Sequence, residues 1–199
     1  MTLTASNIKT LNTIWPMPSI KKDIIMIGAG GIVSDAHLPA YKKAGYKVIG
    51  IYDPKLHKAN KCASDFNIKE IYQNLDEALL KKNIVFDIAV PPAILIDIVK
   101  KLPQRSICQF QKPLGNSLEQ AREIKRIVKE KEIIACVNLQ LKFSPMMIAL
   151  QDAINKNIIG DIDELEISLS VSTPWHLWPF LETLDNVEVP LHSIHYIDW

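Results

Sequence analysis

A short apolar run that stops at glycines constrains the fold of this chain more than any other feature. Residues 23–27 read Asp-Ile-Ile-Met-Ile, and they lead directly into the turn Gly28-Ala29-Gly30-Gly31-Ile32. An apolar run of this length that is bounded by a turn predicts a strand buried on both faces. Gly28 can adopt backbone angles that residues with a Cβ avoid, so the chain can turn sharply at the end of the strand.

This turn favours a dinucleotide-binding unit. Gly30 places no side chain between the backbone and a ligand, and the free N–H groups and positive dipole end of a following helix suit a pyrophosphate. Val33 stands where the full fingerprint has a third glycine. Similar turns occur in S-adenosylmethionine-dependent enzymes and as plain tight turns, so these two alternatives remain open from the turn alone.

Length and charge limit the remaining possibilities. A chain of 199 residues has room for one full domain and part of another. Its net charge of +1 gives no reason to expect nucleic acid or an anionic membrane surface as a partner. No apolar run is long enough to span a bilayer. Residues 1–20 have no positively charged start followed by an apolar block, so we expect an N-terminal extension lying on the domain and no signal peptide.

The three cysteines indicate a reducing compartment. Cys62, Cys108 and Cys136 are scattered, odd in number and without Cys-x-x-Cys spacing. This pattern predicts reduced thiols in a cytoplasmic protein, with neither a disulfide framework nor a zinc site.

Strand and helix patterns alternate after the glycine turn. Apolar runs predict strands at 46–52, 84–90, 106–111 and 133–137, and helical spacing predicts helices between them, the first over 32–44 and ended by Gly45 in a left-handed conformation. Asn74 and Ser117 begin capping boxes. Alternation of this kind predicts an α/β fold, a Rossmann-type doubly wound parallel sheet over residues 21–140.

Ligands of such sheets bind beyond the carboxyl ends of the strands. The residues at the predicted strand ends are therefore the candidate cofactor contacts: Gly28, Ala29, Gly30, Gly31, Ile32, Asp53, Val90, Pro91, Pro92, Gln111, Lys112 and Asn138. Their shared position on one edge is stronger support for nucleotide binding than the glycines alone.

Asp53 has two readings. It lies about 20 residues after the glycines at the end of the second strand, where a carboxylate accepts hydrogen bonds from the adenosine ribose. Asp53-Pro54 also resembles an N-cap followed by a first-turn proline, which would begin the helix that runs to residue 65. Lys55 could tolerate a 2′-phosphate, so NADP stays open although NAD is favoured.

Lys112 follows a predicted strand and precedes Pro113, which prevents a helix from beginning at once. A lysine held there would reach the nicotinamide side of the site, where its ammonium could polarise a hydroxyl or carbonyl and stabilise a developing alkoxide. Without further context, a solvated surface lysine is the competing interpretation.

At this point the sequence resembles the Gfo/Idh/MocA family of sugar and cyclitol oxidoreductases, from about residue 22 to its end. The resemblance rests on an ordered set of motifs: Gly28-Ala29-Gly30-Gly31-Ile32, His37-Leu38-Pro39-Ala40, Tyr52-Asp53-Pro54, Val90-Pro91-Pro92, Gln111-Lys112-Pro113-Leu114, the segment 137–145, Ile159-Gly160-Asp161 and His195-Tyr196-Ile197-Asp198. It implies that Lys112 is the catalytic or substrate-orienting lysine and that His195 is its acid/base partner.

The sequence departs from the family pattern at three positions. Gln111 stands where the family usually has Glu, Lys142 where it usually has Arg, and Leu191 where many members have an acid. Gln111 and Leu191 favour an alternative function, a non-catalytic dinucleotide-binding regulator of the same fold. A methyltransferase would leave the Gln-Lys-Pro turn unexplained.

Residues 141–199 predict an incomplete second domain. Ser144-Pro145 predicts a helix start, and strict alternation over 165–172 predicts a half-buried antiparallel strand. One strand cannot pair its backbone or bury its face alone. The resemblance implies an open antiparallel sheet for substrate binding and oligomer contacts, so we expect a truncated chain whose full-length form is a homo-oligomer.

The C-terminal tail combines aromatic and polar side chains that suit a sugar. Together with Lys112, the expected substrate contacts are Trp175, His192, His195 and Asp198. A metal reading of His192 and His195, which could share a helix face, lacks further ligands. The predicted function is therefore NAD(P)-dependent hydride transfer between a nicotinamide and a CH–OH group of a sugar, polyol or cyclitol, with no metal.

Overall fold

A computed structural model describes residues 8–172, 176, 181–182, 184 and 187–198. Residues 24–137 contain a six-stranded sheet with the order β3-β2-β1-β4-β5-β6, in which all neighbours are parallel. The strands are β1 Ile24–Ile27, β2 Val48–Tyr52, β3 Glu70–Ile71, β4 Val85–Ile88, β5 Ile107–Phe110 and β6 Ile134–Val137. This order is that of the Rossmann fold and confirms the predicted fold class.

Helices connect the strands. The π-helix η1 and the helix α2 follow β1, α3 follows β2, and the others follow in chain order. Their bounds are η1 Val33–His37, α2 Leu38–Ala44, α3 Leu56–Phe66, α4 Leu75–Leu79, α5 Pro92–Lys101, α6 Leu118–Glu130, η2 Gln140–Phe143, α7 Pro145–Asn155, η5 Val189–Ser193 and α8 Ile194–Ile197. Over the described residues, none of the helices has the length and apolar character needed to cross a bilayer.

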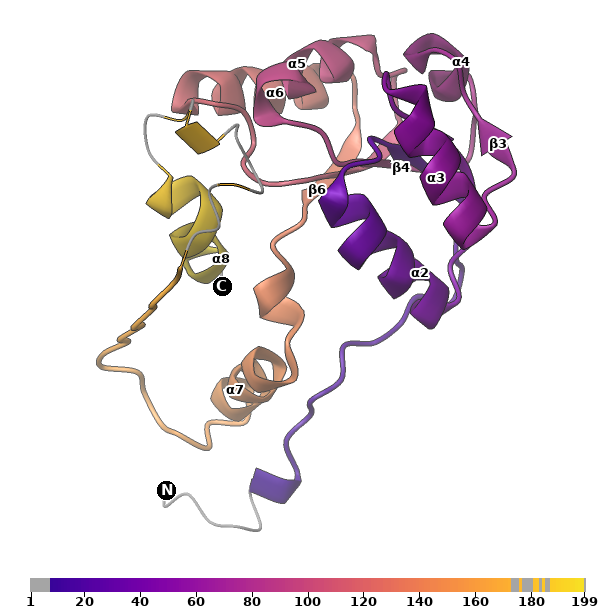
Figure 1. Cartoon of the computed structure of the whole chain (residues 1–199). Coiled ribbons are helices and arrows are strands. Elements are labelled where there is room, and N and C mark those ends of the chain that lie inside the picture. The colour runs from indigo at the N-terminus through magenta and orange to yellow at the C-terminus, as the bar shows by residue number, and fades with distance from the viewer. Residues whose placement is uncertain (1–7, 173–175, 177–180, 183, 185–186, 199) are drawn as a thin grey trace. The chain divides into compact units, whose positions relative to one another are not determined.

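Strand β1 is buried on both faces, as its apolar run predicts. Ile25 and Ile27 pack into a core with α4, α5 and α6, and Ile24 and Met26 pack into a second core with η1, α2 and α3. The side chains alternate because successive strand residues point to opposite faces. Helices therefore cover both sides of the sheet, and α5 and α6 lie side by side on one of them (Figure 1).

The predicted caps form where the sequence places them. Asn74 Oδ1 accepts a hydrogen bond from the Glu77 N–H at 2.9 Å and caps α4, and Ser117 Oγ accepts from Gln120 N–H at 3.3 Å and caps α6. Gly45 ends α2 in the left-handed conformation, with φ of 70°. Side-chain acceptors at these positions satisfy N–H groups that have no partner within the helix.

One of the two interpretations of Asp53 is wrong. Helix α3 begins at Leu56 with Lys55 as its N-cap, so Asp53 does not cap it. Leu118 of α6 and Met146 of α7 are 61% and 72% exposed. Each lies in the first turn of its helix, and the buried stripe begins further along, at Ile124 in α6 and at Met147 in α7.

The chain divides into two compact units, residues 20–138 and residues 1–19 with 139–199. In the second unit Ser144 Oγ caps α7, and the N-terminal segment contacts the same helix: the Asn12 N–H donates to Asp152 at 2.8 Å, and Lys156 donates to the Thr10 carbonyl at 2.9 Å. Trp15 packs edge-on against Phe143, with ring centroids 4.9 Å apart.

The antiparallel strand predicted over 165–172 does not form. Residues 162–172 contain no strand, and the apolar side of the alternating pattern is exposed at Leu165, Ile167, Leu169 and Val171. A strand requires a neighbour to pair its backbone. Over the described residues, every pairing in the structure belongs to the parallel sheet, so this segment has no strand to pair with.

Candidate functional site

The carboxyl ends of neighbouring strands bring the predicted cofactor residues to one edge of the sheet. Residues that follow a strand donate a backbone hydrogen bond to the neighbouring strand of the sheet. Gly28 N–H donates to Tyr52 O at 2.7 Å, and Gln111 N–H donates to Ile88 O at 3.0 Å. Asn138 N–H donates to Phe110 O at 2.8 Å. The order along the edge is therefore Asp53, Gly28, the 89–92 turn, Gln111 and Asn138.

The two glycines of the turn meet different surroundings. Gly28 has φ of +110°, and a Cβ built on it would lie 2.3 Å from the Ala89 carbonyl oxygen. A Cβ on Gly30 would have no atom within 4 Å. Gly28 therefore allows β1 and β4 to approach, whereas Gly30 faces open space just before the helical turn that begins at Gly31, whose first N–H groups have no partner within the helix. The chain thus has a cradle that fits a pyrophosphate.

Asp53 connects the second strand to the glycine turn. Its Oδ2 accepts the Ala29 N–H and its Oδ1 accepts the Lys55 N–H, both at 2.8 Å. The carboxylate is thereby fixed at the edge beside the turn. Each carboxylate oxygen has a further lone pair with which it can accept from a hydroxyl.

The turn after β4 begins the next helix. Val90 is half-buried, Pro91 is the N-cap of α5, and Pro92 is its first residue, where a missing N–H costs nothing. The two prolines hold this part of the edge in one backbone conformation, next to the glycine turn.

Lys112 lies after β5 on the same edge and is half-buried. Burial lowers the pKa of its ammonium, because the charged form loses water. Gln111 Oε1 accepts the Lys112 backbone N–H at 3.1 Å, and the Lys112–Pro113 peptide is cis. The side chain of Gln111 thus fixes the backbone of Lys112 through this hydrogen bond.

A buried polar cluster lies behind this edge, and sequence reasoning missed it. His37 Nδ1 is 2.6 Å from Asp87 Oδ2, which also accepts the Tyr41 O–H at 2.7 Å. His37 is 6% exposed and Asp87 is 0% exposed. Burial, followed by the charge of Asp87, raises the pKa of Tyr41 well above its usual range. The available signal was an aspartate inside the apolar run of β4, because a buried charge requires partners.

The predicted residues of the C-terminal tail belong to the other unit. His195 is buried, His192 Nδ1 lies 3.0 Å from Glu188 Oε2, and Asp198 pairs with Lys142 at 2.6 Å. A cavity of about 410 Å³ within this unit is lined in part by Trp15, Lys142 and Asp198. Trp175 lies outside the described residues. Lys112 belongs to the unit of residues 20–138, and His195 belongs to the unit that contains residues 139–199.

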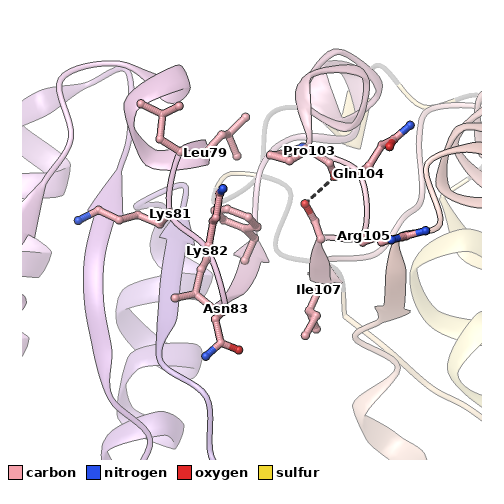
Figure 2. A pocket seen from close by; sticks show the side chains of 12 residues that line it. Leu79, Lys81, Lys82, Asn83, Pro103, Gln104, Arg105 and Ile107 are labelled. Carbon is pink, nitrogen blue, oxygen red and sulfur yellow. Dashed lines mark hydrogen bonds between the residues drawn. The ribbon is translucent and has the colours of Figure 1, made fainter.

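A second cavity, of about 540 Å³, lies at the opposite edge of the sheet. Its lining includes Ile84 and Ser106, which directly precede β4 and β5, and Figure 2 shows the 79–84 loop on one side and the 103–107 loop on the other. Lys81 and Arg105 in its lining are paired with Glu70 and Glu132, each at 2.6 Å. The cavity is therefore distinct from the strand ends at which ligands of this fold bind.

Metal ligation has no candidate in the part of the chain that the structure describes. There, no group of three or more His, Cys, Asp or Glu side chains is placed to hold an ion. None of Cys62, Cys108 and Cys136 is in a disulfide, and burial raises the pKa of the Cys108 thiol to about 12. Such a thiol is chemically inert at neutral pH.

Comparison with known families decides the identity of the fold. The model of the Gfo/Idh/MocA oxidoreductase family, described as having an NAD-binding Rossmann fold, matches residues 22–139, more than half of the chain. The chain belongs to this family. The match contains the whole sheet and all the strand-end residues described above. Among curated protein sequences, none matches the chain significantly.

Solved structures show the same fold at low sequence identity. Myo-inositol dehydrogenase from Lactobacillus casei, in complex with NAD(H) and myo-inositol, has a TM-score of 0.63 and 20% identity, covering 71% of this chain and 43% of that one. The super-repressor mutant of Gal80p from Saccharomyces cerevisiae has a TM-score of 0.62 and 20% identity, covering 71% and 40%.

A third structure carries a nucleotide sugar. The WlbA dehydrogenase from Bordetella pertussis, in complex with NADH and UDP-GlcNAcA, has a TM-score of 0.58 and 16% identity, covering 71% of this chain and 44% of that one. The chain therefore spans less than half the length of each of these three proteins.

Proposed function

We propose that the strand-end edge binds a nicotinamide cofactor, and that the protein takes part in hydride transfer between this cofactor and a CH–OH group of a sugar, polyol or cyclitol. The observation that carries the proposal is the position of Gly30, Asp53 and Lys112 on one edge of one parallel sheet. Family membership supports the cofactor class, and the inositol and nucleotide-sugar complexes of structural neighbours support the substrate class.

The glycine turn and Asp53 would hold the adenosine half of the cofactor. The N–H groups of the helical turn that begins at Gly31, directly before η1, suit the pyrophosphate, and Asp53 would accept hydrogen bonds from the ribose hydroxyls. A carboxylate fixed beside the turn would repel a 2′-phosphate, which favours NAD over NADP. Ala29, Gly31, Ile32, Val90, Pro91, Pro92, Gln111 and Asn138 complete the proposed cofactor contacts.

Lys112 would act on the substrate oxygen. A bound nicotinamide supplies or accepts the hydride, and the Lys112 ammonium would stabilise negative charge that develops on the oxygen. Because burial lowers its pKa, the ammonium releases its proton more easily than an exposed lysine does.

The second unit would complete the active site. We propose His195 as the acid/base partner, with Trp175, His192 and Asp198 contacting the sugar. The chain spans less than half the length of its structural neighbours, so these roles concern the protein in its full-length form, which we propose to be a cytoplasmic homo-oligomer. Cysteines that are not in disulfides are consistent with that compartment.

The test is a fluorescence titration of the chain with NADH and NADPH. We expect NADH to bind more tightly, and binding of neither would contradict the proposal. In the full-length protein, Lys112→Met should abolish turnover and leave NADH affinity largely intact. Lys125→Met, which changes an exposed lysine on α6, is the matched control and should leave turnover unchanged.

The second candidate function is a dinucleotide-binding regulator that does no chemistry. Gln111 in place of a carboxylate favours it, and so does the likeness to the super-repressor mutant of Gal80p. A full-length protein that binds NADH but neither oxidises nor reduces any of a panel of sugars and inositols would favour the regulator. Turnover of any of them would exclude it.

A further inference from the structure

The buried cluster behind the strand ends connects four elements through one histidine ring. His37 at the end of η1 contacts Asp87 of β4 through Nδ1, at 2.6 Å. Its other ring nitrogen, Nε2, lies 3.4 Å from Gln111 Nε2 and 3.3 Å from Asn138 Nδ2, at the ends of β5 and β6. None of these contacts is needed for the Rossmann topology itself, since the sheet is held by its own backbone ladders.

Donor and acceptor chemistry fixes the state of this ring. An ionised carboxylate can only accept, so Nδ1 carries the proton that is shared with Asp87. Asp87 Oδ2 accepts a second hydrogen bond from Tyr41, whose hydroxyl in turn accepts from Gln109 Nε2 at 3.3 Å. In the neutral ring with a protonated Nδ1, Nε2 is a bare acceptor. Its single lone pair can be shared by the amide N–H groups that face it from Gln111 at 3.4 Å and from Asn138 at 3.3 Å.

The orientation of the Gln111 amide supports this assignment independently. Its Oε1 accepts the Lys112 backbone N–H at 3.1 Å, which leaves its Nε2 to face His37. A doubly protonated ring would point a donor at two amide donors. Reversing the Gln111 amide to relieve that clash would break the bond to Lys112. The contacts form one consistent series only when Nε2 carries no proton.

We propose that His37 is a positioning residue, which fixes the backbone of Lys112 by accepting a hydrogen bond from Gln111 at Nε2 while Asp87 holds its Nδ1 proton. The importance of this role for catalysis rests on the function proposed above for Lys112. His37 itself would contact neither cofactor nor substrate. The hydrogen bonds that join His37, Gln111 and the Lys112 backbone exist in the cofactor-free chain and can be tested there without any ligand.

The proposal also explains why an amide suits position 111. An amide can accept from Lys112 and donate to a neutral His37 at the same time. A carboxylate there could do both tasks only if Nε2 gained a proton. The groups that face His37 are Asp87 from β4, Gln111 and Asn138 from the strand ends, with Tyr41 of α2 sharing Asp87. Gln111→Glu would therefore place the ring between two carboxylates and favour the imidazolium.

The first experiment is ¹⁵N NMR of the full chain, labelled at histidine, at neutral pH and without cofactor. The expected signature for His37 is one protonated, pyrrole-type nitrogen at Nδ1 and one unprotonated, pyridine-type nitrogen at Nε2. In Gln111→Glu, Nε2 should become protonated at the same pH. A wild-type His37 with Nε2 protonated would overturn the proposal, whichever variants fold.

The second experiment measures hydrogen exchange of the Lys112 backbone amide. In His37→Phe, Gln111 loses its anchor, and exchange at Lys112 should speed up about fivefold, the factor that corresponds to one net hydrogen bond. The amide of Ile51 in β2 reports global stability, which should fall because Asp87 also loses a donor, so the Lys112 effect is the acceleration beyond that at Ile51. His57→Phe, at an exposed histidine of α3, is the matched control and should alter neither amide. Unchanged exchange at Lys112 in His37→Phe would overturn the proposal.

The two proposals fail separately. Loss of NADH binding by the wild-type chain would contradict the proposed function, while the NMR signature and the Lys112 exchange would still decide the role of His37. If His37→Phe does not fold, Gln111→Ala removes the same link from the other side. It should speed up Lys112 exchange and leave His37 Nε2 unprotonated, and unchanged exchange in this variant would overturn the role of Gln111 as the link.

Discussion

At the scale of single residues, Gly28 and Gly30 differ although both belong to the same turn. Gly28→Ala would place a Cβ 2.3 Å from the Ala89 carbonyl oxygen at φ of +110°, so the backbone must shift. We expect a loss of roughly 1–3 kcal/mol in the free energy of unfolding, as for other strained positions. Urea unfolding of the variant measures this loss.

Gly30→Ala is the matched comparison. A Cβ at this position meets no atom within 4 Å, so the free energy of unfolding should change little. NADH affinity should nevertheless fall, because the new methyl group occupies the space proposed for the pyrophosphate. A Gly30→Ala variant as unstable as Gly28→Ala, or one with full NADH affinity, would contradict this assignment.

Lys112 should make stability depend on pH. Burial lowers its pKa below the ordinary value of 10.5, so between the two values the unfolded chain binds more protons than the folded one. The free energy of unfolding therefore rises with pH between the folded and the unfolded pKa of Lys112. Below the folded pKa, the full cost of burying the ammonium destabilises the folded chain. Lys112→Met removes the penalty, so its stability advantage over the wild type should shrink between pH 7 and pH 10.

Urea unfolding at both pH values measures this effect, with Lys125→Met as a control whose difference from the wild type should stay constant. A constant difference for Lys112→Met as well would show that the ammonium is not penalised by the fold.

Residue positions could be predicted from the sequence better than residue partners. The glycine turn, Asp53 and Lys112 lie where strand-end reasoning placed them, because that reasoning needs only the order of the strands. The contact of Asp53 with Ala29 could not be predicted, since a capping role fits the same sequence. Neither could the pairing of His37 with Asp87, which are 50 residues apart and meet only through the tertiary fold.

At the scale of elements, the Ser117 cap tests how much α6 depends on its first turn. Ser117→Ala removes the acceptor for the Gln120 N–H, so we expect the free energy of unfolding to fall by about 1 kcal/mol. Chemical denaturation measures the change. Ser64→Ala, inside α3 and exposed, should be neutral or slightly stabilising because alanine favours helix interiors. Equal effects of the two substitutions would argue against the cap.

Local sequence patterns were enough to predict those elements whose start, end or burial is marked by nearby residues. Capping boxes, the glycine after α2 and the apolar run of β1 are read within a few residues. The strand predicted over 165–172 was wrong because alternation shows which face a strand would bury, but pairing requires a neighbour that local sequence cannot supply. The two-residue strand β3 was not predicted, since its pattern is too short to have a period.

At the scale of the whole molecule, both apolar cores lie within one unit. Every residue of the two clusters falls between positions 24 and 133, inside the unit 20–138. We therefore expect a fragment of residues 20–138 to fold alone and to bind NADH with an affinity close to that of the full chain. Circular dichroism with NADH titration checks this, and an unfolded fragment would show that the remaining residues are required.

The fold of this unit could be predicted because alternating strands and helices leave few topologies. The organisation of residues 139–199 could not, since the chain spans less than half the length of its structural neighbours and the family match ends at residue 139.

The most direct test of the central claim is a ¹H–¹⁵N NMR titration of the chain with NADH. The strand-end account predicts that the amides of Gly30, Asp53 and Asn138 shift together with one binding constant, while Arg105 at the opposite edge of the sheet does not shift. Shifts confined to the opposite edge, or no shift at any strand end, would contradict it.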